Sequence, residues 1–545
     1  MKGKTAIAKI LKMEGVEFIS GFPYNEVFES AAEEGIRCIA TRTERVAVNI
    51  ADAYTRVSNS KRIGVCAMQS GPGIENSFSG VAQAYSDSIP ILVLPSGPAQ
   101  RRFLPPNFIA PKNYREITKW ADTINFADRV PEMMRRAFTC LRTGRPGPVL
   151  LEMPSDVLNE EFDDTKFPYK PVKATKSAGD PADIRIAAKA LIAAQNPVIR
   201  SGQGVLFAGA WDELLELAEL LQIPVFTTNC GKSSFPENHP LALGTAGNTH
   251  PKMVIHFLNK ADLVFAIGSS CTKENFTVPI PDSKRIIQST IDERDLNKDY
   301  NLEHAIIGDA KLVLRQLIDE VKVQIGPDGR KKSNTVAKEI KTVKDEWLKE
   351  WMPKLTSNDI PINPYRVVWD MMKVLDRKET IITHDSGNPR SQLIPFWECL
   401  VPGGYIGWGK TTPLGSSLGF SMGAKLARPD KTAVAFMGNA AFGMVGMDFE
   451  TAVRQNLPIL VVLVNNSVLG GYAKDSPVAS KQYNFTDQSG DYTKIAQGMG
   501  GYSERVDRPD DIIPALKRAK KAVDSGQAAL LEIITCEETA RCSYH

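Results

Sequence analysis

Short apolar segments alternate with helical segments along the whole chain, and the alternation recurs in three blocks. In the first block, an apolar run at 63–68 is followed by a Gly-Pro-Gly turn, a helical segment at 74–86 and a second apolar run at 90–95. Strands that alternate with helices pair in parallel, and the helices cover both faces of the sheet. The sequence therefore predicts an α/β protein with three doubly wound parallel-sheet domains.

Polar and proline-rich stretches separate the three blocks. Lys, Pro and Ala replace periodic apolar residues at 168–181, and the run at 326–335 reads Gly-Pro-Asp-Gly-Arg-Lys-Lys-Ser-Asn-Thr. A chain of 545 residues is also too long for one hydrophobic core. These observations predict an N-terminal domain at 1–168, a middle domain at 183–326 and a C-terminal domain at 355–545.

Charge and composition exclude several classes of protein. The 66 Lys and Arg residues nearly balance the 63 Asp and Glu residues, and no long block of like charge predicts binding to nucleic acid or to an anionic membrane. The sequence contains neither an apolar run of about 18 residues nor a signal peptide. Eight scattered Cys without a C-x-x-C pair are typical of reduced thiols. We therefore expect a cytoplasmic protein that binds small molecules and is not attached to a membrane.

The segment from 437 to 466 contains the most informative polar residues. One apolar run leads into a predicted loop, Gly438-Asn439-Ala440-Ala441-Phe442-Gly443, and a second apolar run ends in Asn465-Asn466. Loops after two parallel strands meet at the carboxyl edge of the sheet, so Asn439 and Asn466 can converge there. Their oxygen atoms suit Mg²⁺ bridged to a phosphate. The alternative is that they are ordinary turn residues.

The same segment resembles the thiamine diphosphate motif, in which Gly-Asp-Gly is followed further along by Asn-Asn. The chain is similar over nearly its whole length to the family of acetolactate synthase, oxalyl-CoA decarboxylase and 2-hydroxyacyl-CoA lyase. The supporting segments are Arg42-Thr43-Glu44, Gln69 to Asn76, Gly144 to Val149, Leu414 to Asp430 and Gly446 to Pro458. The resemblance implies a pyrimidine-binding N-terminal domain, a Rossmann-like middle domain and a diphosphate-binding C-terminal domain.

The resemblance also implies roles for individual residues. Glu44 would be catalytic, because its carboxylate would hydrogen-bond N1′ of the aminopyrimidine and promote loss of the C2 proton of the thiazolium. The alternative for Glu44 is a solvated carboxylate at a helix start. Leu414 would support the bent cofactor, or else be an ordinary core leucine. The implied cofactor contacts are Gly71, Asn76, Asn388, Thr412, Leu414, Gly438, Asn439, Ala440, Ala441, Asn466, Val468, Leu469 and Gly470, and the implied metal ligands are Asn439, Asn466 and the Val468 carbonyl.

Several positions depart from the family pattern. Asn439 stands where the family has Asp, and the loss of one anion predicts weakened but not abolished Mg²⁺-dependent cofactor binding. Ala440 replaces the second Gly of the motif, and Thr43 replaces His. In the middle domain, the glycines at 200–204 are a weak dinucleotide signal. Family members bind FAD, ADP or nothing there, and because 270–276 lacks the arginine of FAD-binding synthases, FAD is not expected to be required, although it is not excluded.

These features predict a thiamine diphosphate- and Mg²⁺-dependent lyase or carboligase that acts on 2-oxo acids and is similar to acetolactate synthase. One alternative is a 2-hydroxyacyl-CoA or oxalyl-CoA lyase or decarboxylase with an acyl-CoA substrate. The acceptor pocket differs from that of a standard acetolactate synthase at 21–25 and 108–110. The second alternative, suggested by Asn439, is a thiamine diphosphate-binding protein without turnover. The resemblance further implies a homodimer or homotetramer with active sites between subunits.

Overall fold

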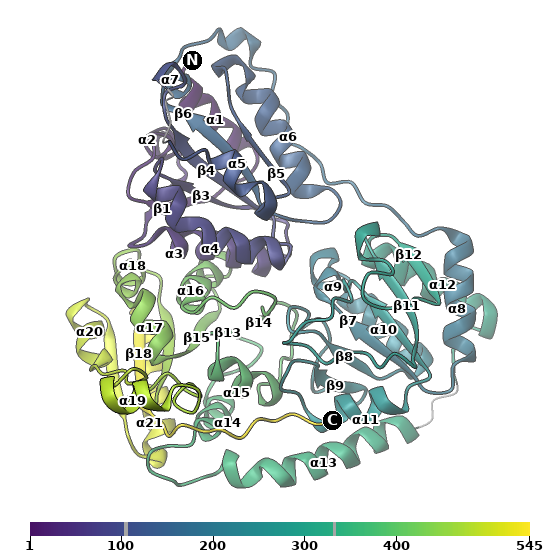
Figure 1. Ribbon diagram of the computed structural model, residues 1–545. Helices are drawn as coiled ribbons and strands as arrows, with labels where there is room; N and C mark the ends of the chain where they lie inside the picture. Colours follow the sequence, from purple (N-terminus) through teal and green to yellow (C-terminus); the bar gives the residue numbers. More distant parts are fainter. Residues whose placement is uncertain (103–106, 331–333) are drawn as a thin grey trace.

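The protein contains three separate parallel β-sheets. The computed structural model describes residues 1–102, 107–330 and 334–545. Within these residues each sheet has six strands, and the neighbouring strands pair in parallel (Figure 1). Helices lie on both sides of the sheets, so the predicted class of three doubly wound α/β domains is confirmed. The strands of each sheet lie inside one of the three predicted ranges, while the boundaries themselves remain predictions.

The N-terminal sheet has the strand order β2-β1-β3-β4-β6-β5. Its strands are β1 (Phe18–Phe22), β2 (Arg37–Ala40), β3 (Gly64–Met68), β4 (Ile91–Gly97), β5 (Trp120–Thr123) and β6 (Val149–Pro154). Its helices are α1 (Gly3–Met13), α2 (Val27–Glu33), α3 (Glu44–Val57), α4 (Pro72–Ser86), α5 (Ala110–Tyr114), α6 (Val130–Arg142) and α7 (Ser155–Asn159). Every residue of β3, β4 and β6 is buried, as expected for central strands covered on both faces.

The middle sheet has the strand order β12-β11-β10-β7-β8-β9. Its strands are β7 (Pro197–Ser201), β8 (Val225–Thr227), β9 (Ala242–Thr245), β10 (Leu263–Ile267), β11 (Arg285–Thr290) and β12 (His304–Ile307). Its helices are α8 (Pro181–Ala193), α9 (Gln203–Ala208), α10 (Trp211–Leu221), α11 (Lys252–Lys260) and α12 (Ala310–Ile325). If the six strands of this domain are numbered 1 to 6 along the chain, from β7 to β12, their order in the sheet is 3-2-1-4-5-6. This is the strand order of dinucleotide-binding folds.

The C-terminal sheet has the strand order β14-β13-β15-β16-β18-β17, which repeats the order of the N-terminal sheet. Its strands are β13 (Thr380–His384), β14 (Tyr405–Ile406), β15 (Thr432–Gly438), β16 (Ile459–Asn465), β17 (Tyr502–Val506) and β18 (Ala529–Ile534). Its helices are α14 (Pro364–Val374), α15 (Asn388–Phe396), α16 (Ser416–Ala427), α17 (Asn439–Val445), α18 (Phe449–Arg454), α19 (Pro477–Tyr483), α20 (Tyr492–Gly498) and α21 (Ile512–Asp524).

Two helices lie where the sequence predicted a domain boundary or a loop. Helix α13 (Thr335–Leu355) follows the polar run at 326–335, of which 331–333 lie outside the described residues. It connects the middle and C-terminal domains and buries Ile340, Val343 and Trp347, which recur at helical spacing. The predicted loop at 438–443 is also wrong, because α17 starts at Asn439 directly after β15. Ala440 and Ala441 have high helix propensity and sit in its first turn.

The N-terminal domain rests on the C-terminal domain through α3 and α16 (Figure 1). Two glycines of α16 permit this close approach. A Cβ atom on Gly423 would lie 2.3 Å from the carbonyl oxygen of Ile50, and one on Gly419 would lie 2.6 Å from Cβ of Asn49. Real Cβ atoms do not approach other atoms so closely, so glycine is required at both positions for this packing.

The C-terminal segment 536–545 runs from the end of β18 to the middle domain, where the chain ends beside α11 (Figure 1). The backbone N–H of His250 donates to the carbonyl of Cys542 at 2.7 Å, and the indole N–H of Trp351 donates to the Tyr544 hydroxyl at 2.8 Å. Cys542 is completely buried. The segment therefore ties the C-terminal domain to the middle domain. In the described chain, no helix has both the length and the apolar character needed to cross a membrane.

Candidate functional site

The strand order of the C-terminal sheet reverses between β13 and β15. In open parallel sheets, ligands bind at the carboxyl ends of the strands at such a point. The loop after β13 leads to Asn388 at the start of α15, and the chain after β15 passes Gly438 and Asn439. The loop after β16 begins with Asn466 at the same edge of the sheet. Three asparagines thus follow three neighbouring strands.

Glycine contacts show how closely these loops approach one another. A Cβ atom on Gly470 would lie 2.7 Å from Nδ2 of Asn388 and 3.4 Å from Nδ2 of Asn466. The structure therefore brings Asn388, Asn466 and Gly470 together, and a side chain at 470 would fill the space between the two amides. We call the group Asn388, Gly438, Asn439, Asn466 and Gly470 the amide crevice.

Asn439 is a buried polar residue whose amide lacks a partner. Its side chain is the first of α17 and the residue is 3% exposed, and Nδ2 has no hydrogen-bond acceptor in the described chain. A buried amide without a partner costs free energy, and such groups are rare unless a ligand, ion or water satisfies them. The burial of Asn439 is therefore consistent with a polar ligand in the amide crevice.

The oxygen atoms here can hold a Mg²⁺ ion that is also bound to a diphosphate. Oδ1 of Asn466 accepts from the Val468 N–H at 3.2 Å and keeps a second lone pair, and the Val468 carbonyl accepts no hydrogen bond in the described chain. Together with the Asn439 side chain they offer neutral oxygen atoms, of the hard type that Mg²⁺ prefers. No group of three or more His, Cys, Asp or Glu among the described residues could hold a metal ion. The negative charge at this site would therefore come from the diphosphate.

Asp385 positions the loop that contains Thr412 and Leu414. Its carboxylate accepts from the N–H groups of Gly415 at 2.8 Å and Ser417 at 3.1 Å, and from the Ser417 hydroxyl at 2.6 Å. Burial raises the pKa of Asp385, and these hydrogen bonds oppose that shift. Thr412 and Leu414 are half-buried, and Leu414 packs against the C-terminal core. The sequence predicted a role for Asn388, three residues further along, but not this positioning role of Asp385.

Glu44 is the first residue of α3 and is only 6% exposed. Its carboxylate has no hydrogen-bond or ion-pair partner among the residues that the structure describes, and the low exposure of Glu44 favours the predicted role over a solvated carboxylate. The preceding residues are held by Asp448 of the C-terminal domain, which accepts from the Arg42 N–H at 2.7 Å and from the Thr43 hydroxyl at 3.0 Å. Thr43, a departure from the family pattern, thus helps to fix the start of α3.

Two implied cofactor contacts lie elsewhere on the N-terminal domain. Gly71 has a positive φ of 67° at the start of α4, and Asn76 is exposed on the same helix. The end of α4 contacts the C-terminal domain instead, through the hydrogen bond from Ser416 to Gln83 at 2.9 Å. The structure does not bring Gly71 or Asn76 to the amide crevice within one chain. Of the other implied contacts, Ala440 and Ala441 form the first turn of α17, and Leu469 precedes Gly470.

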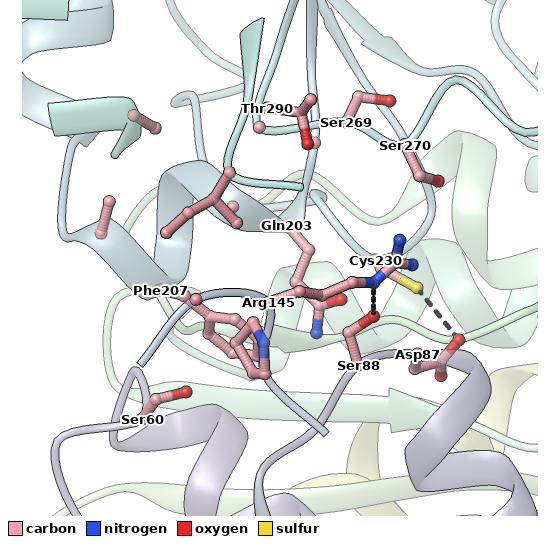
Figure 2. Close-up of a pocket in the computed structure, with 18 of the residues that line it drawn as sticks. Ser60, Asp87, Ser88, Arg145, Gln203, Phe207, Cys230, Ser269, Ser270 and Thr290 are labelled. Carbon is pink, nitrogen blue, oxygen red and sulfur yellow. Dashed lines mark hydrogen bonds between the residues drawn. The ribbon is translucent and has the colours of Figure 1, made fainter. Parts of the chain in front are cut away.

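A larger cavity, of about 580 Å³, lies where the middle sheet reverses its order between β7 and β10 (Figure 2). The weak dinucleotide signal at 200–204 lies on its wall. A Cβ atom on Gly202 would lie 2.2 Å from the Gly268 carbonyl oxygen, so the two loops require glycine to pack. Figure 2 shows Arg145, which donates to Ser88 at 3.0 Å, beside Cys230 and Phe207. The place of these residues on the cavity wall was not predicted from the sequence.

Comparison with known proteins covers all three domains. Models of thiamine pyrophosphate enzymes match at 1–110 (N-terminal TPP binding domain), 184–317 (central domain) and 385–533 (C-terminal TPP binding domain). The chain is 32% identical to a probable acetolactate synthase large subunit from Methanocaldococcus jannaschii, across 98% of this chain and 92% of the relative. It is 29% identical to glyoxylate carboligase from Escherichia coli O157:H7, across 95% and 90%. Acetolactate synthase isozyme 3 large subunit from Escherichia coli K12 is 25% identical, across 98% and 94%.

The three matched models follow one another in the order of the three sheets, and the relatives align along almost the entire chain. The thiamine diphosphate cofactor predicted from the sequence agrees with the matched models of its binding domains. The chain therefore belongs to the family of thiamine pyrophosphate enzymes, among the members similar to acetolactate synthase.

Proposed function

We propose that this protein uses thiamine diphosphate and Mg²⁺ to form or break a carbon-carbon bond next to the carbonyl of a 2-oxo acid, as an acetolactate synthase-like carboligase does. The observation that carries the proposal is the buried Glu44 carboxylate, which has no partner in the described chain and is preceded by residues fixed on Asp448. A carboxylate kept in this state can exchange a proton with a bound heterocycle. Bound thiamine diphosphate would supply a carbon nucleophile for attack on the substrate carbonyl.

Different residues of the chain would bind the diphosphate, hold the metal ion, position the loop under the cofactor and exchange a proton. Asn388 and Gly470 would bind the diphosphate, while Asn439, Asn466 and the Val468 carbonyl would hold Mg²⁺ beside it. Asp385 would keep the loop around Leu414 in place under the cofactor, through its hydrogen bonds to Gly415 and Ser417. Glu44 would hold or release a proton at N1′ of the aminopyrimidine.

Exposed apolar residues next to the amide crevice support a homo-oligomer with the active site at a subunit interface. Large hydrophobic side chains that are more than half exposed gather between 444 and 485, namely Met444, Met447, Tyr472, Val478, Tyr483 and Phe485. Exposed large apolar side chains are a feature of protein interfaces. The exposed position of Asn76 and the partly exposed position of Gly71 support the same assignment, because a partner subunit could bring them to the cofactor. A homodimer or homotetramer is therefore expected in sedimentation experiments.

The cavity of the middle domain supports nucleotide binding there, because it lies at the switch point of a sheet with the dinucleotide-binding order. A bound FAD is not required by the proposal, since segment 270–276 lacks the arginine of FAD-binding synthases. A visible absorption spectrum of the purified protein distinguishes flavin from ADP or an empty cavity.

Substrate consumption tests the proposed function. We expect pyruvate to be consumed in the presence of thiamine diphosphate and Mg²⁺ without any acyl-CoA. Consumption only of an acyl-CoA substrate would favour the 2-hydroxyacyl-CoA or oxalyl-CoA lyase. Cofactor binding in isothermal titration without turnover of pyruvate, glyoxylate or an acyl-CoA would instead establish the non-catalytic alternative.

Restoring an acid at position 439 tests the metal assignment. We expect Asn439→Asp to lower the Mg²⁺ concentration for half-maximal thiamine diphosphate binding by at least about tenfold, as changes near metal sites commonly do. The added charge would lie nearer to the ion than to the diphosphate, so attraction exceeds repulsion. Asn466→Ala should raise the same concentration. The measurement is a Mg²⁺ titration at fixed cofactor, followed by tryptophan fluorescence.

Asn484→Asp is the matched control, because Asn484 is an exposed amide in the same domain and should leave the Mg²⁺ midpoint unchanged. If Asn439→Asp and Asn466→Ala both titrate like the unmodified protein, the ion is bound elsewhere and the assignment of 438–468 to the diphosphate is wrong.

A further inference from the structure

A second cavity, of about 290 Å³, lies beside the connecting helix α13. Its walls come from α13, α14, the end of α15 and the segment of the middle domain from β9 to the start of α11. We call it the linker-helix pocket. It shares no lining residue with the middle-domain cavity of Figure 2 and includes no residue of the amide crevice. Figure 1 shows α13 passing along α14 and α11, on the opposite side of the molecule from the N-terminal domain.

The inner surface of the linker-helix pocket is aromatic and apolar. Trp347 and Phe396 are stacked, with ring centroids 5.1 Å apart and planes inclined by 10°, and both residues are almost completely buried. Trp369 is half-buried and adds a third ring. The remaining apolar side chains of the lining are Ala242, Met253, Leu348, Met372, Pro251 and Pro395. A ligand that enters would therefore contact flat rings and flexible thioether side chains, which adapt to apolar groups.

The charged groups of the pocket carry an excess of positive charge. Glu398 lies between two cations, with Lys344 and Arg377 each 2.6 Å from its carboxylate. Burial raises the pKa of Glu398, but these cations outweigh burial and hold the pKa below its usual range. One carboxylate that faces two cations leaves one positive charge uncompensated.

The same imbalance occurs on α14. Lys373 lines the pocket and lies 2.7 Å from Asp370, which is also bound by Arg366 at 2.6 Å. The only other acid in the lining, Glu237, is neutralised by the buried Lys232 at 2.6 Å. Lys344, Arg377 and Lys373 have side chains that are 28–45% exposed, so their remaining N–H groups are accessible to a ligand.

We propose that the linker-helix pocket binds a small organic anion that joins an aromatic body to a single carboxylate. The rings of Trp347, Trp369 and Phe396 would contact the aromatic body, and Arg377, Lys344 and Lys373 would bind the carboxylate. Small-molecule sites commonly combine an apolar wall with a few convergent polar groups in a cavity of this size. An inorganic anion would leave the apolar wall in contact with water, and a neutral ligand would leave the excess charge unmatched.

Titration of the full-length protein with 3-phenylpropanoate tests the proposal. Thiamine diphosphate and Mg²⁺ are kept at saturating concentration so that the amide crevice is occupied. We expect binding in isothermal titration at least about tenfold tighter than that of 3-phenylpropan-1-ol, because only the carboxylate can accept charge-assisted hydrogen bonds from Arg377, Lys344 and Lys373. 3-Phenylpropylamine and acetate, which lack the carboxylate and the ring respectively, should bind more weakly still.

Variants place the binding event in this pocket. Arg377→Gln and Trp369→Ala should each weaken 3-phenylpropanoate binding by at least about tenfold, and Trp369→Phe should retain most of it. Lys349→Gln is the matched control, because Lys349 is an exposed lysine of α13 outside the lining. Thermal unfolding of each variant confirms that it is folded. The proposal is overturned if 3-phenylpropanoate does not bind, if the alcohol binds as tightly, or if the folded Arg377→Gln and Trp369→Ala variants both bind like the unmodified protein.

Discussion

Glu44→Gln is expected to lower turnover of the 2-oxo acid by about 10²- to 10⁴-fold, the usual contribution of a general acid or base. Gln has nearly the same shape and can still form one hydrogen bond with the aminopyrimidine, but it cannot hold a proton for exchange with N1′. The fold and most of the thiamine diphosphate binding should persist, since the Glu44 carboxylate has no partner in the described chain to lose. Turnover and cofactor affinity are measured on the same preparation.

Hydrogen-deuterium exchange at C2 of the bound cofactor reports directly on the step assigned to Glu44. Glu33→Gln serves as the control, because Glu33 is exposed on α2 of the same domain and should affect neither turnover nor exchange. Exchange in Glu44→Gln as fast as in the unmodified protein would show that Glu44 does not activate the cofactor, whatever the turnover.

Arg56→Met is expected to destabilise the protein by about 3–5 kcal/mol, the usual cost of removing one partner from a buried ion pair. Arg56 lies 2.5 Å from Asp52 and 2.9 Å from Asp87, and all three side chains are almost completely buried. It also donates to the Gly407 carbonyl at 3.0 Å, which connects α3 to the C-terminal domain. Without Arg56, the buried carboxylates of Asp52 and Asp87 would lose their shared counter-ion. Thermal and denaturant unfolding measure the loss.

The pH dependence of this loss follows from the direction of one pKa shift. Burial raises the pKa of Asp52 above its usual value, even though Arg56 acts to lower it. Removing Arg56 should raise the pKa further in the folded state, so the folded variant binds a proton more readily than the unfolded chain. Stability is then lost as pH rises through the folded pKa, and the deficit of Arg56→Met should shrink in acid.

Arg428→Met is the surface control for this variant. Arg428 pairs with Asp430 at 2.7 Å, but both side chains are about half exposed, so the loss should be at most about 1 kcal/mol. Combining Arg56→Met with Asp52→Asn and Asp87→Asn should recover part of the stability. Equal losses in Arg56→Met and Arg428→Met would contradict a buried charge network within the N-terminal domain.

The sequence predicted those features that depend on neighbouring residues. Every residue of β16 is buried, so a central parallel strand appears in the sequence as an uninterrupted apolar run. The order of strands and helices then indicated three doubly wound sheets. The motif from Gly438 to Asn466 could also be predicted, because β15 and β16 are neighbours both in the sequence and in the sheet.

Features that depend on contacts between distant segments were not predictable. Asp448 holds the residues before Glu44 although about four hundred positions separate them, and nothing near either residue indicates that contact. The burial of Glu44, the closeness of Gly470 to Asn388 and the lining of both cavities depend in the same way on contacts between distant segments. Periodicity and turn chemistry act within a few residues, so the sequence by itself determined the strands, helices and motif of this protein. Only the tertiary structure decided which side chains share a site, because long-range packing brings them together after those local elements have formed.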